Sequence, residues 1–314
     1  MSIEELAAAE RAQRATVVER GGIYWRQVRP LFFRPLLIVK SYSAGLVVPP
    51  GAKLWNAFQH GVPSSEPANS FLNLLLFDQV NSYSLASLDS SKRRQVRVAA
   101  KEFTIRPVTD ANEFKENAYP VYLEFYKRTK YSYMSQRRRA NSFSRWTDWL
   151  FSLPKVVVLG GYRRGELAGV STSMWVEDTL LLPTAFCADQ GRKLHVNSLM
   201  LHTVREAAAQ CPGIRQVYAG PYKHNGGRGI DAFYLERGCR MARTPACLHI
   251  NPVLKLLLAF LLPRQYGKLL GKMDDGVGVD NCFDGPTVTE GSPGGRTEGE
   301  VIASHDGKVL SHHA

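Results

Sequence analysis

The sequence lacks the signatures of several common protein classes. Its cysteines are widely separated and form no C-x-x-C pair; they are Cys187, Cys211, Cys239, Cys247 and Cys282. This spacing argues against a zinc cluster and against a disulfide framework, so we expect reduced thiols and no bound metal. The chain has no G-x-S-x-G, Walker A or H-E-x-x-H motif. The usual serine hydrolases, P-loop NTPases and zinc metalloproteases are therefore excluded.

Long apolar runs are also missing. No stretch approaches the roughly 20 apolar residues of a membrane-spanning helix. The clearest apolar segments, residues 36–39 and 256–262, are much shorter. Residues 1–20 are rich in Ala, Glu and Arg and do not resemble a secretory signal. We therefore expect a cytoplasmic protein, with peripheral contact to the inner membrane face as an additional option.

Charge is distributed unevenly along the chain. Lys and Arg number 40 and Asp and Glu number 28, which gives a formal net charge of +12. Residues 274–314 hold eight acids and two bases, so the preceding residues carry +18. A body this basic attracts polyanions such as a nucleotide cofactor, tRNA or an anionic membrane. Charge alone does not distinguish these partners from a plain solvated surface.

Residues 180–252 read as alternating strands and helices. The predicted elements are a strand at 180–188, a polar turn at 189–193, a helix, a strand at 216–219, a short helix at 230–237 and a strand at 247–250. Asn197 or Ser198 can cap the first of these helices, and Gly238 can end the second. A helix start beside Arg192 and Lys193 offers backbone amides and cations to a phosphate group.

The earlier part of the chain gives a similar mixture of elements. We predict helices at 2–20, 91–101, 110–130 and 142–152, strands at 23–29, 31–39, 44–48, 71–77 and 103–108, a loop at 60–70, and a hairpin at 156–162 and 167–175. The helix at 91–101 is strongly basic, which fits either a phosphate-bearing substrate or a solvated face. An apolar helix at 253–262 is expected to pack on the N-terminal region, with a membrane surface as the alternative.

The segment AFYLERGCR at residues 232–240 resembles the GNAT acyltransferase signature F-Y-x-x-x-G-F. The hairpin sequence VVVLGGYRRGELAGVS also resembles the family's second and third strands. The resemblance implies an α+β fold with a mixed sheet and an acyl-CoA or acetyl-CoA co-substrate. It also implies that Tyr234 protonates the leaving thiolate of coenzyme A. A core tyrosine beside Phe233 is the alternative reading.

The phosphate-binding loop departs from the family's Q/R-x-x-G-x-G/A pattern. Leu194 and Val196 stand where the family has two small residues. By position, the cofactor-binding candidates are Gln190, Gly191, Arg192, Lys193, Asn197 and Ser198. The FemAB-like branch, which uses aminoacyl-tRNA, tolerates this loss. The segments SKRRQVR at residues 91–97 and GIDAFYLERGCR at residues 229–240 resemble that branch as well.

We therefore expect residues 1–90 to form an N-terminal α/β region, a partial or diverged copy of the fold. Residues 91–272 form the acyltransferase domain, and 273–314 a disordered acidic tail. The predicted function is direct transfer of an acyl group from acyl-CoA or another carrier to a small-molecule or cell-envelope amine. The alternatives are an aminoacyl-tRNA-dependent transferase and a non-catalytic protein that binds a polyanion or membrane. Of the candidate bases Glu124, Asp189, His195 and His224, His224 is the best placed, in a loop before the second helix.

Overall fold

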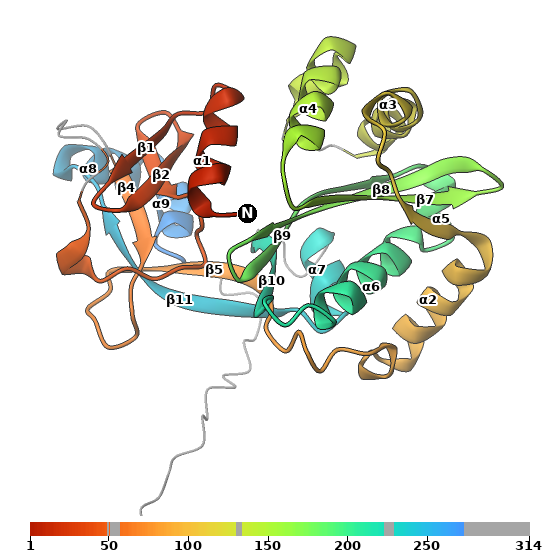
Figure 1. The fold of residues 1–314 in the computed structure, drawn as a ribbon. Helices are drawn as coiled ribbons and strands as arrows, with labels where there is room; N and C mark the ends of the chain where they lie inside the picture. The colour runs from red at the N-terminus through yellow and green to blue at the C-terminus, as the bar shows by residue number, and fades with distance from the viewer. Residues whose placement is uncertain (49, 51–56, 130–133, 223–228, 273–314) are drawn as a thin grey trace, which may run out of the picture. The chain divides into compact units, whose positions relative to one another are not determined.

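The computed structural model describes residues 1–48, 50, 57–129, 134–222 and 229–272. In these ranges the strands form one 11-stranded sheet with the order β1-β2-β3-β4-β11-β5-β10-β9-β8-β7-β6 (Figure 1). The strands are β1 (Val17–Arg20), β2 (Ile23–Arg29), β3 (Phe32–Pro35), β4 (Ala57–Gly61), β5 (Ser70–Phe77), β6 (Thr104–Pro107), β7 (Val156–Arg163), β8 (Glu166–Val176), β9 (Thr179–Cys187), β10 (Gln216–Pro221) and β11 (Arg240–His249). The helices are α1 (Ile3–Ala12), α2 (Ser90–Glu102), α3 (Ala111–Arg128), α4 (Ala140–Ser152), α5 (Asp189–Lys193), α6 (Val196–Ala209), α7 (Ile230–Leu235), α8 (Pro252–Leu261) and α9 (Pro263–Leu269).

From β6 onward the order of elements is that of a GNAT-type fold. Two helices follow β6, an antiparallel meander of β7, β8 and β9 comes next, and α6, β10, α7 and β11 complete the unit. Helices α3 and α4 cover one face of the meander, and α6, backed by α2, covers the other (Figure 1). The α+β mixed-sheet fold expected from the sequence is confirmed.

Local sequence explains why the central elements form. The β7–β8 hairpin turns at Arg164 and Gly165, whose φ angles of 53° and 86° suit a tight two-residue connection. Helix α3 begins after Asp110, whose carboxylate accepts hydrogen bonds from the amides of Asn112 and Glu113 at 2.6 and 2.8 Å. Its apolar residues recur at helical spacing and are buried against α4 and the meander.

The N-terminal region and the C-terminal strand share the sheet. Strand β11 lies between β4 and β5 and pairs antiparallel with both, with Cys247 opposite His60 and Ala242 opposite Leu74. Residues Met1–Val277 form one compact unit. The predicted division at residue 90 stays a prediction, and residues 273–314 lie outside the described residues.

Several N-terminal predictions were wrong. The helix ends at Ala12, and Val17–Arg20 is strand β1, because Gly21 and Gly22 (φ 59° and 74°) turn the chain into β2. Residues Ala44–Leu46 form a 3-10 helix where a strand was expected, and β3 spans only Phe32–Pro35. The predicted loop at 60–70 begins inside β4, a strand that the sequence did not suggest.

Helix α8 contradicts the expected packing on the N-terminal region. None of its residues is buried, and Phe260 and Leu261 are 82% and 71% exposed. Asn251 caps the helix by accepting hydrogen bonds from the amides of Val253 and Leu254 at 2.8 and 3.4 Å. Within the described ranges, no helix has both the length and the apolar character needed to cross a bilayer.

Candidate active site

The parallel strands β9 and β10 separate at the centre of the sheet. Their pairing covers only Thr179–Leu181 on β9 and Gln216–Tyr218 on β10. Beyond this point β9 continues along β8 to Cys187, whereas β10 follows β5 through a bulge at Tyr218 and Gly220. A strand directs alternate N–H groups to its two sides. Some backbone N–H groups of residues 182–187, among which Pro183 has none, therefore face the side that β10 has left, where they can polarise a carbonyl group.

The start of α6 is fixed by packing on glycines. Val196 is fully buried, and its methyl carbons pack closely against three glycines. A Cβ atom added to the glycine would lie only 2.5 Å from a Val196 methyl carbon at Gly161, 2.9 Å at Gly169 and 3.1 Å at Gly191. A Cβ on Gly191 would also lie 2.6 Å from the carbonyl oxygen of Ala168. The Val196 side chain therefore anchors residues 187–198, called the β9–α6 corner from here on, to β7 and β8 at the position where the resembling GNAT loop has a small residue.

Residues 189–193 form the one-turn helix α5, not the predicted turn. Arg192 and Lys193 are exposed, and both form ion pairs with Asp189, at 3.0 and 2.8 Å. Hydrogen bonds from Lys193 and Arg192 lower the pKa of the Asp189 carboxyl. The two cations predicted to hold a phosphate are therefore already paired with a carboxylate. Gln190 is exposed on the same turn, and Gly191 is buried.

Neither predicted cap begins α6. The N-cap is His195, which adopts a left-handed conformation with φ 62° and gives no side-chain cap. Ser198 is buried, and its Oγ accepts a hydrogen bond from the guanidinium of Arg237 at 3.0 Å. Asn197 hydrogen-bonds the thiol of Cys187, whose pKa is raised mainly by burial. Both residues thus stabilise the corner from inside.

Arg237 connects three helices. It is buried, and its guanidinium donates to the Phe233 carbonyl oxygen at 2.8 Å, to Gln95 Oε1 at 2.6 Å and to Ser198 at 3.0 Å. Next to it, Glu236 forms an ion pair with Lys92 of α2. The two segments that resemble FemAB-like proteins, on α2 and on α7, are therefore in direct contact. This pairing could not be predicted from the sequence, because the partners are more than 140 residues apart.

The basic face of α2 divides into two parts. Lys92 is held by Glu236, and Arg93 donates to the carbonyl oxygens of Ala86 and Leu88. Arg94 and Arg97 are exposed, and neither has an ion-pair partner among the described residues. These two arginines are the part of the predicted cluster that remains open to a polyanion.

Tyr234 lies in the main hydrophobic core. It is 6% exposed and packs edge to face on Phe77 and Phe233, with ring centroids 6.2 and 5.4 Å away. This position matches the alternative reading of a core tyrosine, and its predicted catalytic role stays a prediction. His224, the second catalytic candidate, lies outside the described residues.

The other candidate bases lie around the β9–α6 corner. Glu124 accepts the backbone N–H of Asp189 at 2.7 Å, so it supports α5. His195 is half-buried, and burial, followed by the charges of Arg237 and Lys92, lowers its pKa. A neutral imidazole at neutral pH is the form that accepts a proton. Asp231, a fully buried acid in the first turn of α7, was not predicted from the sequence; it raises the pKa of Tyr222, second to burial.

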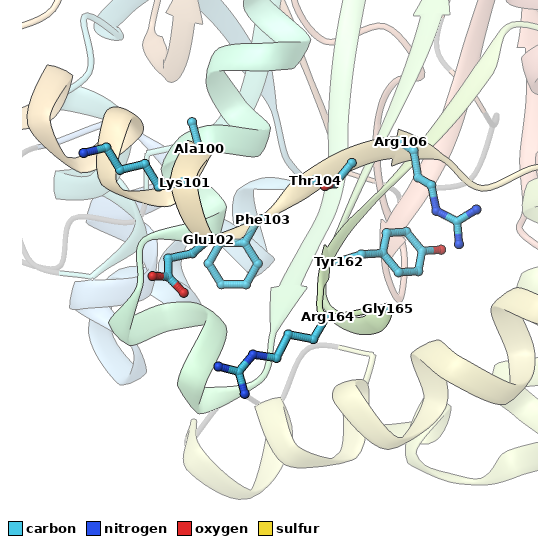
Figure 2. A pocket seen from close by; sticks show the side chains of 9 residues that line it. All are labelled: Ala100, Lys101, Glu102, Phe103, Thr104, Arg106, Tyr162, Arg164 and Gly165. Carbon is cyan, nitrogen blue, oxygen red and sulfur yellow. The ribbon is translucent and has the colours of Figure 1, made fainter.

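A separate pocket lies at the outer edge of the sheet. It has a volume of about 490 Å³ and is lined by the end of α2, by β6 and by the β7–β8 turn (Figure 2). Figure 2 shows the Arg106 guanidinium beside the Tyr162 ring, and the distance to the ring centroid is 4.0 Å. Strands β7 and β8 separate β6 from β9, so this pocket is not part of the β9–α6 corner.

Comparison with known proteins gives matches in structure but none in sequence. No protein-family model matches the chain, and no curated protein matches it by sequence. The crystal structure of FemX matches with a TM-score of 0.57 and 11% identity, over 81% of this chain and 93% of FemX. The chain shares the FemX fold.

Two further matches support this assignment. The C-terminal domain of a protein described as a lysylphosphatidylglycerol synthetase, from Agrobacterium fabrum, matches with a TM-score of 0.55 and 10% identity, over 86% of this chain and 94% of the domain. L-PGS from Bacillus licheniformis matches with a TM-score of 0.50 and 11% identity, over 84% and 97%. At these identities the likeness establishes the fold alone.

Proposed function

We propose that the protein is a transferase that passes an acyl group directly to an amine, without a covalent enzyme intermediate. The observation that carries the proposal is the separation of β9 from β10 beside the start of α6. In this arrangement amides of residues 182–187 polarise the donor carbonyl while the amine attacks it. His195, neutral because its pKa is lowered, accepts the amine proton and returns it to the donor's leaving oxygen or sulfur as the bond to the acyl carbon breaks.

We favour aminoacyl-tRNA as the donor. Val196 fills the position of a small loop residue, and Asp189 already pairs with Arg192 and Lys193, so the corner is poorly suited to a pyrophosphate in the usual acyl-CoA pose. The exposed Arg94 and Arg97 on α2 offer a phosphate-binding face instead. The likeness of the fold to FemX and the resemblance of residues 91–97 and 229–240 to FemAB-like proteins agree with this preference. Acyl-CoA or acetyl-CoA remains the second candidate, supported by the open edge of β9.

Binding measurements distinguish the two donors. The purified full chain is titrated with acetyl-CoA, a long-chain acyl-CoA, aminoacyl-tRNA and deacylated tRNA, and turnover is followed as loss of the acyl donor when amines are added. We expect salt-dependent tRNA binding that weakens about tenfold in Arg94→Glu/Arg97→Glu. The matched control Arg20→Glu/Arg29→Glu reverses two exposed bases on β1 and β2 and should bind within about twofold of the wild type.

Each other result points to a different function. Saturable acyl-CoA binding that weakens in Arg192→Ala/Lys193→Ala would establish acyl-CoA as the donor. Binding of tRNA without consumption of any acyl donor would refute the transferase proposal and favour a non-catalytic polyanion-binding protein. Equal loss of tRNA binding in the α2 variant and in its control would show that α2 is no specific contact surface.

We further propose that the α8 surface, formed by the exposed apolar side chains of this helix, contacts an anionic membrane. Its large exposed residues are Val253, Leu256, Leu257, Phe260 and Leu261. Lys255 of α8 and Arg264 and Lys268 of α9 accompany them. An apolar helix face bordered by cations binds anionic lipid surfaces in the plane of the interface. Such contact would bring a lipid-linked or cell-envelope amine to the protein.

Vesicle co-sedimentation tests the α8 surface. The wild type is expected to sediment with vesicles containing phosphatidylglycerol and much less with pure phosphatidylcholine. Phe260→Asp should reduce this binding by about tenfold, because it places a charge in the buried part of the contact. Val98→Asp on α2 is the matched control, since it changes an exposed apolar helix residue elsewhere. Equal binding by wild type and Phe260→Asp would exclude α8 as the contact surface.

A further inference from the structure

Three metal-ligand side chains meet on neighbouring strands far from the β9–α6 corner. Cys247 on β11 lies directly opposite His60 on β4, and His249 lies two residues further along β11. Residues two apart on a strand project from the same face of the sheet, so both side chains lie on one side of β11. One nitrogen or sulfur atom from each of the three residues lies within 4.8 Å of the others.

His60 is held in the form that binds a metal ion. Its side chain is 0% exposed, and its Nδ1 lies 3.1 Å from the carbonyl oxygen of Gly61. A carbonyl only accepts, so Nδ1 carries the proton and Nε2 presents a lone pair. Nε2 is buried and has no hydrogen-bond partner in the described part of the chain.

The side chain of Asn69 holds the β11 backbone between Cys247 and His249 in place. Asn69 accepts the N–H of Leu248 at 2.7 Å and donates to its carbonyl oxygen at 3.0 Å. The ring of His249 stacks on Phe58, with centroids 4.3 Å apart. Cys247 is buried, and its Sγ lies 3.4 Å from the Pro67 carbonyl oxygen. The Leu248 backbone and the Cys247 thiol are therefore held in place by neighbouring groups.

We propose that His60, Cys247 and His249 bind one Zn²⁺ ion. Two imidazole nitrogens and a thiolate form a donor set that suits Zn²⁺, and the exposed side of His249 leaves a fourth position for water. Bonds of about 2.0 Å to nitrogen and 2.3 Å to sulfur bring such ligand atoms to within about 3.6 Å of each other. The exposed His249 ring can close this gap by rotation. The thiol proton of Cys247 is released to solvent as the Zn–S bond forms.

The site was not visible in the sequence. His60 and Cys247 are 187 residues apart in the sequence, and the absence of a C-x-x-C pair led us to expect no metal. The missing information was the insertion of β11 beside β4, which alone brings the residues together.

Metal content and spectroscopy test the proposal on the full chain. The protein is stripped with a chelator and dialysed against Zn²⁺, and the metal is measured per chain by atomic absorption. Co²⁺ then replaces Zn²⁺ and reports a thiolate ligand by its near-ultraviolet charge-transfer band. We expect one Zn²⁺ per chain and a clear band. Cys247→Ser should abolish the band. His249→Ala, a change at an exposed position, should weaken Zn²⁺ binding at least about tenfold, because even the loss of a group that only supports a ligand costs roughly 10- to 100-fold.

Two control variants separate this site from other histidines and thiols. His305→Ala/His312→Ala/His313→Ala removes the histidines of the C-terminal segment, and Cys211→Ser removes a partly exposed thiol elsewhere. Both controls should keep the tight site and the charge-transfer band. Loss of binding in the triple histidine variant with full binding in His249→Ala would overturn the proposal. So would a wild-type chain that takes up no stoichiometric Zn²⁺ or shows no thiolate band.

Discussion

The contact between Val196 and Gly161 predicts a strong thermodynamic coupling. Val196→Ala removes two carbon groups from a fully buried site. Their transfer accounts for about 1.6 kcal/mol, at about 0.8 kcal/mol each. A cavity of roughly 50 Å³ adds about 1.2 kcal/mol at about 24 cal/mol per Å³. The expected loss in the free energy of unfolding is therefore about 3 kcal/mol.

Gly161→Ala perturbs the same contact from the opposite side. Its new methyl carbon would lie 2.5 Å from Val196 Cγ2 and 3.3 Å from Ile105 Cδ1, so the side chains must shift. Overpacking of this kind costs about 1–3 kcal/mol. In the double variant the valine carbon is gone and the new methyl group occupies the cavity. The double variant should be at least about 1 kcal/mol more stable than the sum of the single effects predicts.

Urea unfolding at constant pH, followed by circular dichroism, measures the four free energies of this cycle. Gly45→Ala is the matched control, because a Cβ there meets no atom within 4 Å. It should be nearly neutral and should add to Val196→Ala without coupling. If the effects of Gly161→Ala and Val196→Ala are also additive within about 0.5 kcal/mol, then Val196 does not pack against Gly161 and the proposed anchoring of α6 is wrong.

Two further predictions concern buried polar side chains near the same helices. Arg237→Lys should lower the free energy of unfolding by about 1–3 kcal/mol, because an ammonium group cannot reach Phe233, Gln95 and Ser198 together. Thermal melting measures the loss. The control is Glu236→Gln, a surface change expected to cost under about 1 kcal/mol. Burial lowers the pKa of His202 from the ordinary value of 6.5, so the unfolded chain takes up a proton more readily than the folded one. Stability should therefore fall as pH drops below about 6.5, and His202→Gln should flatten that slope in urea titrations at several pH values; an unchanged slope would contradict the assignment.

The sequence predicted the meander and α6 well because their signals are local. In residues 156–209 the apolar side chains that face the core recur with the period of a strand or of a helix. This periodicity is visible within a short stretch of sequence. Strand β4 was missed for the opposite reason. Gln59 is fully buried and polar, and its partners are Arg34, Ser70 and the carbonyl oxygen of Leu269. Contacts over such separations leave no pattern in a short window.

The strand and helix around the candidate site were predicted in position, but their contacts were not. The end of β9 and the start of α6 lie where the sequence placed a phosphate-binding corner. The sequence could not show that Asp189 pairs with Arg192 and Lys193, since three residue types in one turn fit either a ligand site or a local ion-pair network. It also could not show the contact of α2 with α7, because Gln95 and Arg237 meet only in the folded chain.

The position of β11 has a consequence for synthesis of the chain. Strands β4 and β5 are made early, but they pair with opposite edges of β11, and the Ser70 Oγ that donates to the Ala246 carbonyl oxygen reaches across 176 residues. The edges of β4 and β5 that pair with β11 therefore stay unpaired until most of the polypeptide has left the ribosome. During that interval the nascent N-terminal region exposes unpaired strands, which are a recognised cause of aggregation. Truncated chains that end before residue 240 should accordingly depend on chaperones to stay in solution.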